Sequence, residues 1–182
     1  MGQRPYSLEN IRCLMKRYEI FKRLAGTWKF QRTLTNRSSG EFLGSVKGLA
    51  SITHLQPEVL HYQEKGELVN QLGQKLQIHR EYLYSYDAKQ DEIRKHFSEN
   101  GKNVGLFYLL AFQNLVLEKD EAAIIIAKGD HLCGKDFYKA YYHFKLANSE
   151  TDFTTFTLTY ETTGPNKDYI SETVFNSHQR VN

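Results

Sequence analysis

The sequence contains few of the residues that build disulfide-stapled, disordered or fibrous proteins. Its 182 residues include only three prolines and two cysteines, Cys13 and Cys133. Two cysteines do not make a disulfide framework, and a chain of this length can bury a sizeable core without one. We therefore expect one domain in a reducing compartment, with the cytoplasm as the default. Collagen, coiled-coil and disulfide mini-protein classes are excluded by the same composition.

Long apolar runs and charge of a single sign are also missing. No window approaches the ~20 apolar residues that span a bilayer, and the first residues lack the apolar core of a secretory signal. Lys and Arg number 24 against 21 Asp and Glu, which leaves a net charge of +3 at pH 7. Because the two signs are interspersed without a basic stripe, we expect no nucleic-acid partner.

Aromatic residues are abundant, with 12 Tyr and 11 Phe beside a single Trp. A chain that is rich in Tyr and poor in Pro suits half-buried β-strands. Before the strands, apolar residues from Leu8 to Leu24 recur every three or four positions, which predicts an amphipathic helix after a Ser7 N-cap. We expect residues 1–25 to form this helix and residues 26–182 to form a β-domain on which it packs. The opposite face of the helix is basic and is either solvated or suited to an acidic partner or membrane surface.

After Gly26 the apolar pattern alternates in short runs that turn signals separate. The expected strands cover residues 27–35, 41–54, 58–64, 67–72, 75–86, 92–98, 104–109, 113–118, 122–128, 131–145, 152–162 and 168–176. The expected turns include Lys65-Gly66 and Gly129-Asp130. Since some runs must merge, and since short connections leave no room for crossover helices, we predict an all-β fold. It is a closed or nearly closed antiparallel meander barrel of about eight to ten strands, because closure hides the sheet edges.

Alternation places charged residues on faces that should point into the barrel. Arg32 follows Trp28 and Phe30 on one face, and Arg80 shares a face with Tyr82 and Tyr84. A buried charge without a partner loses several kcal/mol of hydration. In one interpretation the arginines pair with Glu64, Asp136 or tyrosine hydroxyls, or sit at the rim of the barrel. In the other they line a pocket, where each could bind a carboxylate or phosphate through two hydrogen bonds.

A second polar cluster runs from His131 through Cys133 and Asp136 to Tyr138. His131 and Cys133 project from the same face of a strand. Zinc would need further nitrogen or sulfur ligands that the sequence does not offer nearby, so we expect no metal, and no cofactor motif is present. Cys133 as a nucleophile with His131 as base lacks an orienting third group. Packing of Cys133, with His131 hydrogen-bonded to Asp136 or a tyrosine, is the preferred interpretation.

The last strand follows a tight reversal at Gly164-Pro165. Lys167 stands directly after this turn and is either solvated or bent over the mouth of the barrel.

Several spaced motifs together resemble an uncharacterised lipocalin-like domain family of unknown function. They are GxWxxxR from Gly26 through Trp28 to Arg32, GxA from Gly48, YxExG from Tyr62, RxYxY from Arg80, HxCxxDxY from His131 and GPxKxY from Gly164. The resemblance covers about residues 24–180 and implies a closed or nearly closed barrel with a polar-lined interior, without a known reaction or ligand. In the wider lipocalin and calycin superfamily the Trp plugs one barrel end and packs on an Arg near the end of the chain. Trp28 and Arg180 stand in those places.

The resemblance and the alternation select the same candidate ligand-binding residues. They are Arg32, Glu64, Arg80, Tyr82, Tyr84, His131, Cys133, Asp136, Tyr138 and Lys167. The leading hypothesis is an intracellular protein that binds a small polar, anionic or amphipathic ligand inside the barrel.

Two alternatives stay open. One is a small isomerase or hydrolase that uses His131 with Asp136 and with Tyr138 or Cys133. The other is an interaction module that docks through the basic N-terminal helix.

Overall fold

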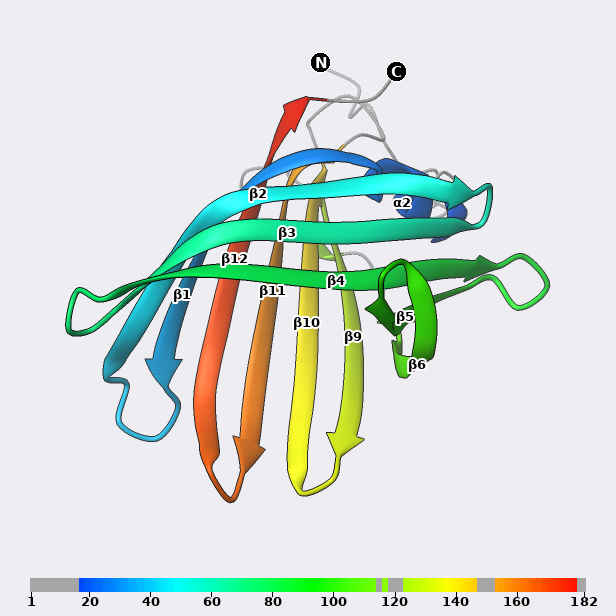
Figure 1. Ribbon diagram of the computed structural model, residues 1–182. Coiled ribbons are helices and arrows are strands. Elements are labelled where there is room, and N and C mark those ends of the chain that lie inside the picture. Colours follow the sequence, from blue (N-terminus) through cyan, green and yellow to red (C-terminus); the bar gives the residue numbers. More distant parts are fainter. Residues whose placement is uncertain (1–16, 114–115, 118–122, 147–152, 180–182) are drawn as a thin grey trace, which may run out of the picture.

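The computed structural model describes residues 17–113, 116–117, 123–146 and 153–179, which form an antiparallel β-barrel and one short helix (Figure 1). The elements in chain order are α2 (Arg17–Leu24), β1 (Gly26–Asn36), β2 (Phe42–Gln56), β3 (Val59–Asn70), β4 (Lys75–Asp87), β5 (Glu92–Glu99), β6 (Lys102–Leu109), β7 (Ala111–Phe112), β8 (Val116–Leu117), β9 (Ala123–Cys133), β10 (Asp136–Leu146), β11 (Phe153–Gly164) and β12 (Lys167–Gln179).

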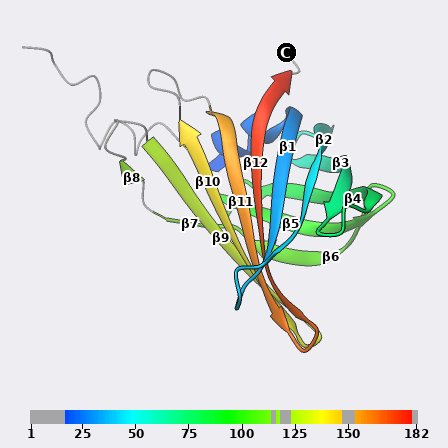
Figure 2. The same cartoon turned by 90° about the vertical axis from the view of Figure 1, so that its left-hand side faces the viewer.

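The strands form a meander that is folded round so that β1 pairs with both β2 and β12. The sheet order is β6-β5-β4-β3-β2-β1-β12-β11-β10-β9-β7, and β8 also pairs with β9. Strands β2 to β4 cross in front of β9 to β12 in Figure 1, and Figure 2 shows the same two walls from the side. The predicted all-β, nearly closed antiparallel barrel is confirmed. The twelve strands of the described residues exceed the expected eight to ten because the stretch near β7 and β8 is broken into short pieces.

One stretch of chain joins the two free edges of the sheet. Strand β6 pairs with β5, and directly after it β7 pairs with β9 through Ala111 opposite Lys128 and Phe112 opposite Ala127. The ring of Tyr108 lies against Gly129, where any Cβ would overlap it. The barrel is therefore nearly closed: β7 pairs with β9 over two positions, and beside them a tyrosine ring packs on a glycine.

Alternation along β1 places its residues as predicted. Trp28, Phe30 and Arg32 are buried, whereas Lys29 and Gln31 are exposed. A strand has a side-chain period of two, so one inward residue determines the direction of its neighbours.

Helix α2 and Trp28 fill one end of the barrel. Ile20, Phe21 and Leu24 are buried in the same core cluster as Trp28, whose Nε1 donates a hydrogen bond to the Leu24 carbonyl oxygen at 2.9 Å. The Trp28 ring also packs edge-on against Phe156, with 4.9 Å between centroids. Arg180, the partner that the superfamily resemblance implies for Trp28, lies outside the described residues.

Only the last part of the predicted helix is described. Residues 17–24 are helical and pack on the barrel, while residues 1–16, including Arg12 and Lys16, lie outside the description. Arg17 donates to the Asp91 carbonyl oxygen at 2.6 Å, and Lys22 pairs with Glu19 at 2.9 Å. The described basic residues of this face thus include two that are bonded to the protein itself. No helix among the described residues is long and apolar enough to cross a membrane.

Two of the predicted turns were wrong, and in both cases the glycine serves close packing instead. Gly66 lies within β3 opposite Gly48, where a side chain at Gly48 would strike the Lys65 backbone. Gly129 lies within β9 under Tyr108. The turn expected there occurs at Gly134, whose φ of +61° favours glycine, so β9 continues to Cys133 and β10 starts at Asp136.

Candidate functional site

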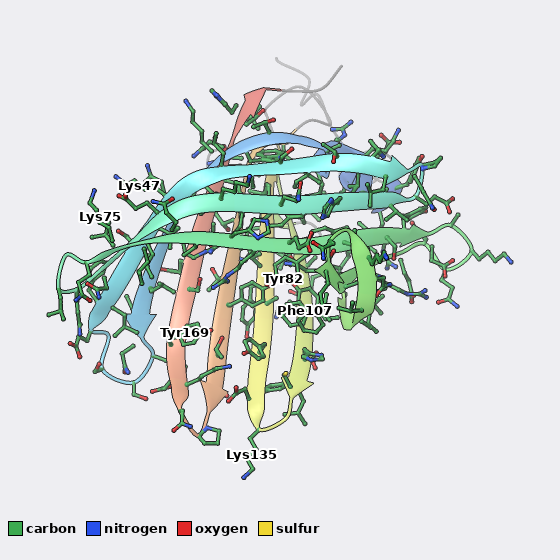
Figure 3. The ribbon with its side chains drawn as sticks, viewed as in Figure 1. Lys47, Lys75, Tyr82, Phe107, Lys135 and Tyr169 are labelled. Atoms are coloured by element: carbon green, nitrogen blue, oxygen red, sulfur yellow. The ribbon has the colours of Figure 1, made fainter. Side chains whose placement is uncertain are left out.

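A cavity of about 290 Å³ lies inside the barrel, toward the end that carries the β9–β10 and β11–β12 hairpins. Its wall comes from seven strands and consists of Leu34, Leu43, Arg80, Tyr82, Phe107, Tyr138, Tyr160, Thr162, Tyr169 and Ser171. Figure 3 labels Tyr82 and Phe107 near the middle of the barrel and Tyr169 on β12. Half of these described lining residues are therefore aromatic, and one of them, Arg80, carries a formal charge.

Arg32 and Glu64 pair with each other and do not line the cavity. The two guanidinium Nη atoms of Arg32 donate to the Glu64 carboxylate at 2.8 and 2.7 Å, and Nε donates to Thr173 Oγ1 at 2.9 Å. The Tyr62 hydroxyl also donates to Glu64. The Arg32 and Glu64 side chains are only 7% and 1% exposed. Of the two alternatives open for Arg32, the structure has the one in which it pairs with a carboxylate.

The protonation of this pair follows from its contacts. Burial by itself would raise the pKa of the Glu64 carboxyl, but hydrogen bonds and charge from Arg32, together with the Tyr62 hydroxyl, hold that pKa below its usual value. Burial would lower the pKa of Arg32, and the bonds to Glu64 outweigh it and raise the pKa instead. Both groups are therefore charged, and their charges cancel.

Arg80 provides the positive charge of the cavity. Its side chain is 54% exposed, and its Nε lies 3.9 Å from Glu64 Oε1, an oxygen that already accepts from Arg32 at 2.8 Å. One carboxylate thus stands between two guanidinium groups. The site has one uncompensated positive charge, and Arg80 presents it to the cavity.

Thr162 contributes an unsatisfied polar group to the same wall. It is completely buried on β11, and among the described residues its Oγ1 has no hydrogen-bond partner. A buried hydroxyl without a partner costs free energy, so native proteins usually supply one from the chain, water or a ligand.

A buried lysine that the sequence analysis did not select lies behind the cavity wall. Lys95 is 2% exposed, and its Nζ donates to the Tyr160 hydroxyl at 3.0 Å. Six rings surround this nitrogen at 4.0 to 5.8 Å from their centroids, namely those of Tyr62, Tyr82, Tyr84, Phe107, Tyr108 and Tyr160. Alternation could have found it, because Lys95 stands between Ile93 and Phe97 on the inward face of β5.

Tyrosine hydroxyls extend from Lys95 in a chain across the barrel. Tyr160 bonds to Tyr108 at 2.5 Å, Tyr108 to Tyr142 at 2.7 Å, and Tyr142 to Tyr84 at 2.9 Å. Burial raises the pKa of each of these phenols above its usual value. Tyr84 was predicted as a wall of the binding site. It is instead the last of these hydrogen-bonded tyrosines and is not among the residues that line the cavity.

The cluster around His131 is arranged differently from the predicted acid–base pair. Asp136 and Tyr138 both bond to Lys167, whose Nζ lies 2.6 Å from Asp136 Oδ2 and 2.8 Å from the Tyr138 hydroxyl. These bonds raise the pKa of the Lys167 ammonium. The His131 ring instead packs edge-on against Phe107 and, within the described parts of the chain, makes no hydrogen bond. The expected His131–Asp136 bond is therefore absent. The β11–β12 hairpin places Lys167 beside Asp136, and Asp136 pairs with this lysine instead.

The remaining candidate residues divide between the cavity and the surface. Tyr82 and Tyr138 line the cavity. The expected packing of Cys133 was wrong, because Cys133 is the last residue of β9 and is exposed in the β9–β10 hairpin with a free thiol. In the portion of the chain that is described, no group of three or more His, Cys, Asp or Glu side chains is placed to hold a metal ion.

Comparison with known proteins identifies a family and a fold. A family model described as "Family of unknown function (DUF6314)" matches residues 24–177. No curated protein matches the sequence.

Among solved structures, the S-type phycobiliprotein lyase CPES from Guillardia theta is similar over 97% of this chain and 100% of its own, with a TM-score of 0.55 and 11% identity. A de novo designed fluorescence-activating β-barrel is similar over 86% of this chain and 95% of its own, with a TM-score of 0.36 and 10% identity. At 11% identity the lyase indicates a shared barrel fold and nothing about shared chemistry.

Proposed function

The chain belongs to the DUF6314 family, for which no function is known, and we propose that it binds a small anionic aromatic molecule in the cavity of its barrel. Rings from Tyr82, Phe107 and Tyr160 offer flat apolar walls, against which an aromatic ligand can stack. The cavity volume of about 290 Å³ suits a compact ligand of one or two rings. The likeness to the lyase concerns the fold, so the ligand class is inferred from the cavity residues alone.

The ligand's negative charge is assigned to Arg80. Its guanidinium can donate two parallel hydrogen bonds to a carboxylate, and the only carboxylate that it contacts among the described residues, Glu64, is already held by Arg32. An anion bound there would restore charge balance around Glu64.

One observation carries the proposed function, and it is the position of the Arg80 guanidinium. Arg80 lies on a cavity wall that also carries several aromatic rings, and the carboxylate beside it, Glu64, already pairs with Arg32. A charge placed in this way is explained if a bound anion balances it.

Arg80→Gln is expected to weaken the binding of 2-naphthoate, a two-ring carboxylate, by about tenfold, because one charged hydrogen-bonding partner is lost from a half-exposed site. Binding of the uncharged 2-naphthamide should change by less than about twofold, since the stacking walls remain. Isothermal titration calorimetry measures both. Lys47→Gln is the matched control, because Lys47 is an exposed lysine on the outer face of β2. Equal weakening by the two variants would show that only the overall charge matters.

Thr162→Val should stabilise the fold and leave ligand binding unchanged. Removing an unpaired buried hydroxyl should raise the free energy of unfolding of the ligand-free protein by about 1 kcal/mol. Binding of 2-naphthoate should change by less than about twofold, because this hydroxyl is buried in the wall and is not exposed to the cavity. Urea denaturation and calorimetry give the two numbers, with Thr154→Val on the exposed side of β11 as the control. A lower free energy of unfolding in Thr162→Val would contradict the explanation, because it would show that the hydroxyl has a partner.

A further inference from the structure

The ligand binding proposed above gives no role to Lys95, a lysine whose side chain is buried inside the barrel. Its nitrogen is enclosed by six aromatic rings, and the one hydrogen bond that it makes within the described structure goes to a phenol. Among the described residues, no carboxylate forms an ion pair with this nitrogen. A lysine held in this way differs from the usual structural lysine, which reaches water or a carboxylate.

Burial and neighbouring positive charges shift Lys95 toward the neutral amine, whereas the faces of the surrounding rings act in the opposite direction because they attract a cation. Complete burial lowers the pKa of Lys95 well below its usual value and outweighs the Glu64 carboxylate, which acts to raise it. The positive charges of Arg32 and Arg80 lower the pKa further. A neutral lysine carries a lone pair on nitrogen, which makes it a nucleophile toward carbonyl carbon.

Lys95 is separated from the cavity by one layer of rings. Tyr82, Phe107 and Tyr160 belong both to the group of rings around its nitrogen and to the cavity wall. The Tyr82 centroid is the nearest, at 4.0 Å from Nζ. A molecule in the cavity can therefore contact the nitrogen only when one shared ring moves aside.

We propose that Lys95 is a covalent binding site, at which its ε-amino group forms an imine with an aromatic aldehyde or ketone held in the cavity. This inference rests on the proposed function, because Arg80 and the ring walls would position the carbonyl compound. The Lys95 lone pair forms a bond to the carbonyl carbon, the C=O π electrons move to oxygen, and a proton passes from nitrogen to that oxygen. In the second step the hydroxyl oxygen takes up one more proton and the C–O bond breaks, so that water leaves. The nitrogen lone pair forms the C=N bond, and nitrogen releases its remaining proton, which replaces the one that left with the water. No oxidant or reductant is needed.

The tyrosine chain fits the proton movements of this reaction. Tyr160 bonds both to the Lys95 nitrogen and to Tyr108, from which the chain continues to Tyr142 and Tyr84. A phenol at this position can accept the proton that nitrogen releases and donate one to the departing oxygen. Burial raises the pKa of Tyr108 and Tyr160 and keeps both phenols protonated, so each hydroxyl can donate a hydrogen bond.

The imine is tested by trapping it on the wild-type protein. The protein is incubated near neutral pH with 6-formyl-2-naphthoate and sodium cyanoborohydride, which reduces an imine to a stable secondary amine. Proteolysis and mass spectrometry then identify each modified lysine. Lys95 should be labelled at least about tenfold faster than the exposed lysines Lys47 and Lys75, since those lie on the surface, away from the cavity that holds the aldehyde. Labelling of the exposed lysines at the same rate, or without Lys95, overturns the proposal.

Three controls separate this proposal from the binding function. Excess 2-naphthoate should slow labelling of Lys95, and Arg80→Gln should slow it by about tenfold, while labelling of Lys47 stays the same. Lys95→Met, with its fold checked by circular dichroism, should still bind 2-naphthoate and lose the fast-labelled site. If 2-naphthoate binds to the wild-type protein but Lys95 is not trapped, the imine is contradicted and the binding function stands. If Lys95 is trapped without any dependence on 2-naphthoate or Arg80, the imine stands and the anion site is contradicted.

Discussion

Glu64→Gln is expected to lower the free energy of unfolding by about 3 to 5 kcal/mol at neutral pH. The substitution leaves the Arg32 guanidinium charged and buried beside a neutral amide, where it has lost two charged hydrogen bonds. Urea denaturation at constant ionic strength measures the change. Glu67→Gln is the matched control, because Glu67 pairs with Lys75 at 3.0 Å on the surface. An exposed pair of that kind contributes less than about 1 kcal/mol.

The cost comes from the unpaired charge, so it should fall when both charges are removed. The double variant Arg32→Met/Glu64→Leu should regain most of the stability that Glu64→Gln loses, since apolar side chains of similar size can replace a buried ion pair. A double variant as unstable as Glu64→Gln would contradict this explanation and would point to packing around Thr173 and Tyr62 instead.

The same pair determines how stability depends on acid. The pKa of Glu64 is lower in the folded protein than in the unfolded chain, so its stabilising contribution is complete above the unfolded value of about 4.3. That contribution is lost as the pH falls through the folded-state pKa, because the unfolded chain binds the proton first. The difference in the free energy of unfolding between the wild type and Glu64→Gln should therefore begin to narrow below about pH 4.3 and shrink further as the pH falls toward the folded-state pKa.

Lys95→Met is expected to make the protein more stable at neutral pH and to flatten the dependence of its stability on pH. The pKa of Lys95 is depressed in the folded state by burial and by neighbouring positive charges. Between that pKa and the unfolded value of about 10.4, the unfolded chain carries a proton that the folded protein lacks. The stability of the wild type therefore rises with pH in this window by up to about 1.4 kcal/mol per pH unit relative to the variant.

The slope is measured by urea denaturation of both proteins at several pH values below about 9, where the tyrosines remain protonated in both states. Taking the difference between the two proteins removes the contribution of every other titrating group. Lys102→Met, at an exposed position at the start of β6, serves as the control and should show no such slope. A flat difference for Lys95→Met would mean that the folded protein keeps Lys95 charged, with the rings as its partners.

Much of the fold could be predicted from local patterns. The alternation of Trp28, Phe30 and Arg32 against Lys29 and Gln31 determined which face of β1 is inward, and the short connections excluded parallel crossovers. Such patterns work because a strand's side chains point to opposite faces whatever the strand packs against.

The predicted turns at Gly66 and Gly129 were wrong for a reason that lies outside the local sequence. Glycine is favoured both where the backbone reverses and where another group must approach closely. Gly129 is required by the ring of Tyr108, which is distant along the chain and adjacent only because the barrel closes.

The sequence by itself determined the barrel, the inward direction of Arg80 and Tyr82, and the enrichment of tyrosine beside charge. Only the tertiary structure decided how those groups are paired, because partners come from strands that meet through closure of the sheet. Glu64 on β3 pairs with Arg32 on β1, and Asp136 pairs with Lys167 and not with His131. Aromatic rings from four strands enclose Lys95. Pairing energies depend on distances of a few ångströms, and the order of residues along the chain does not set those distances.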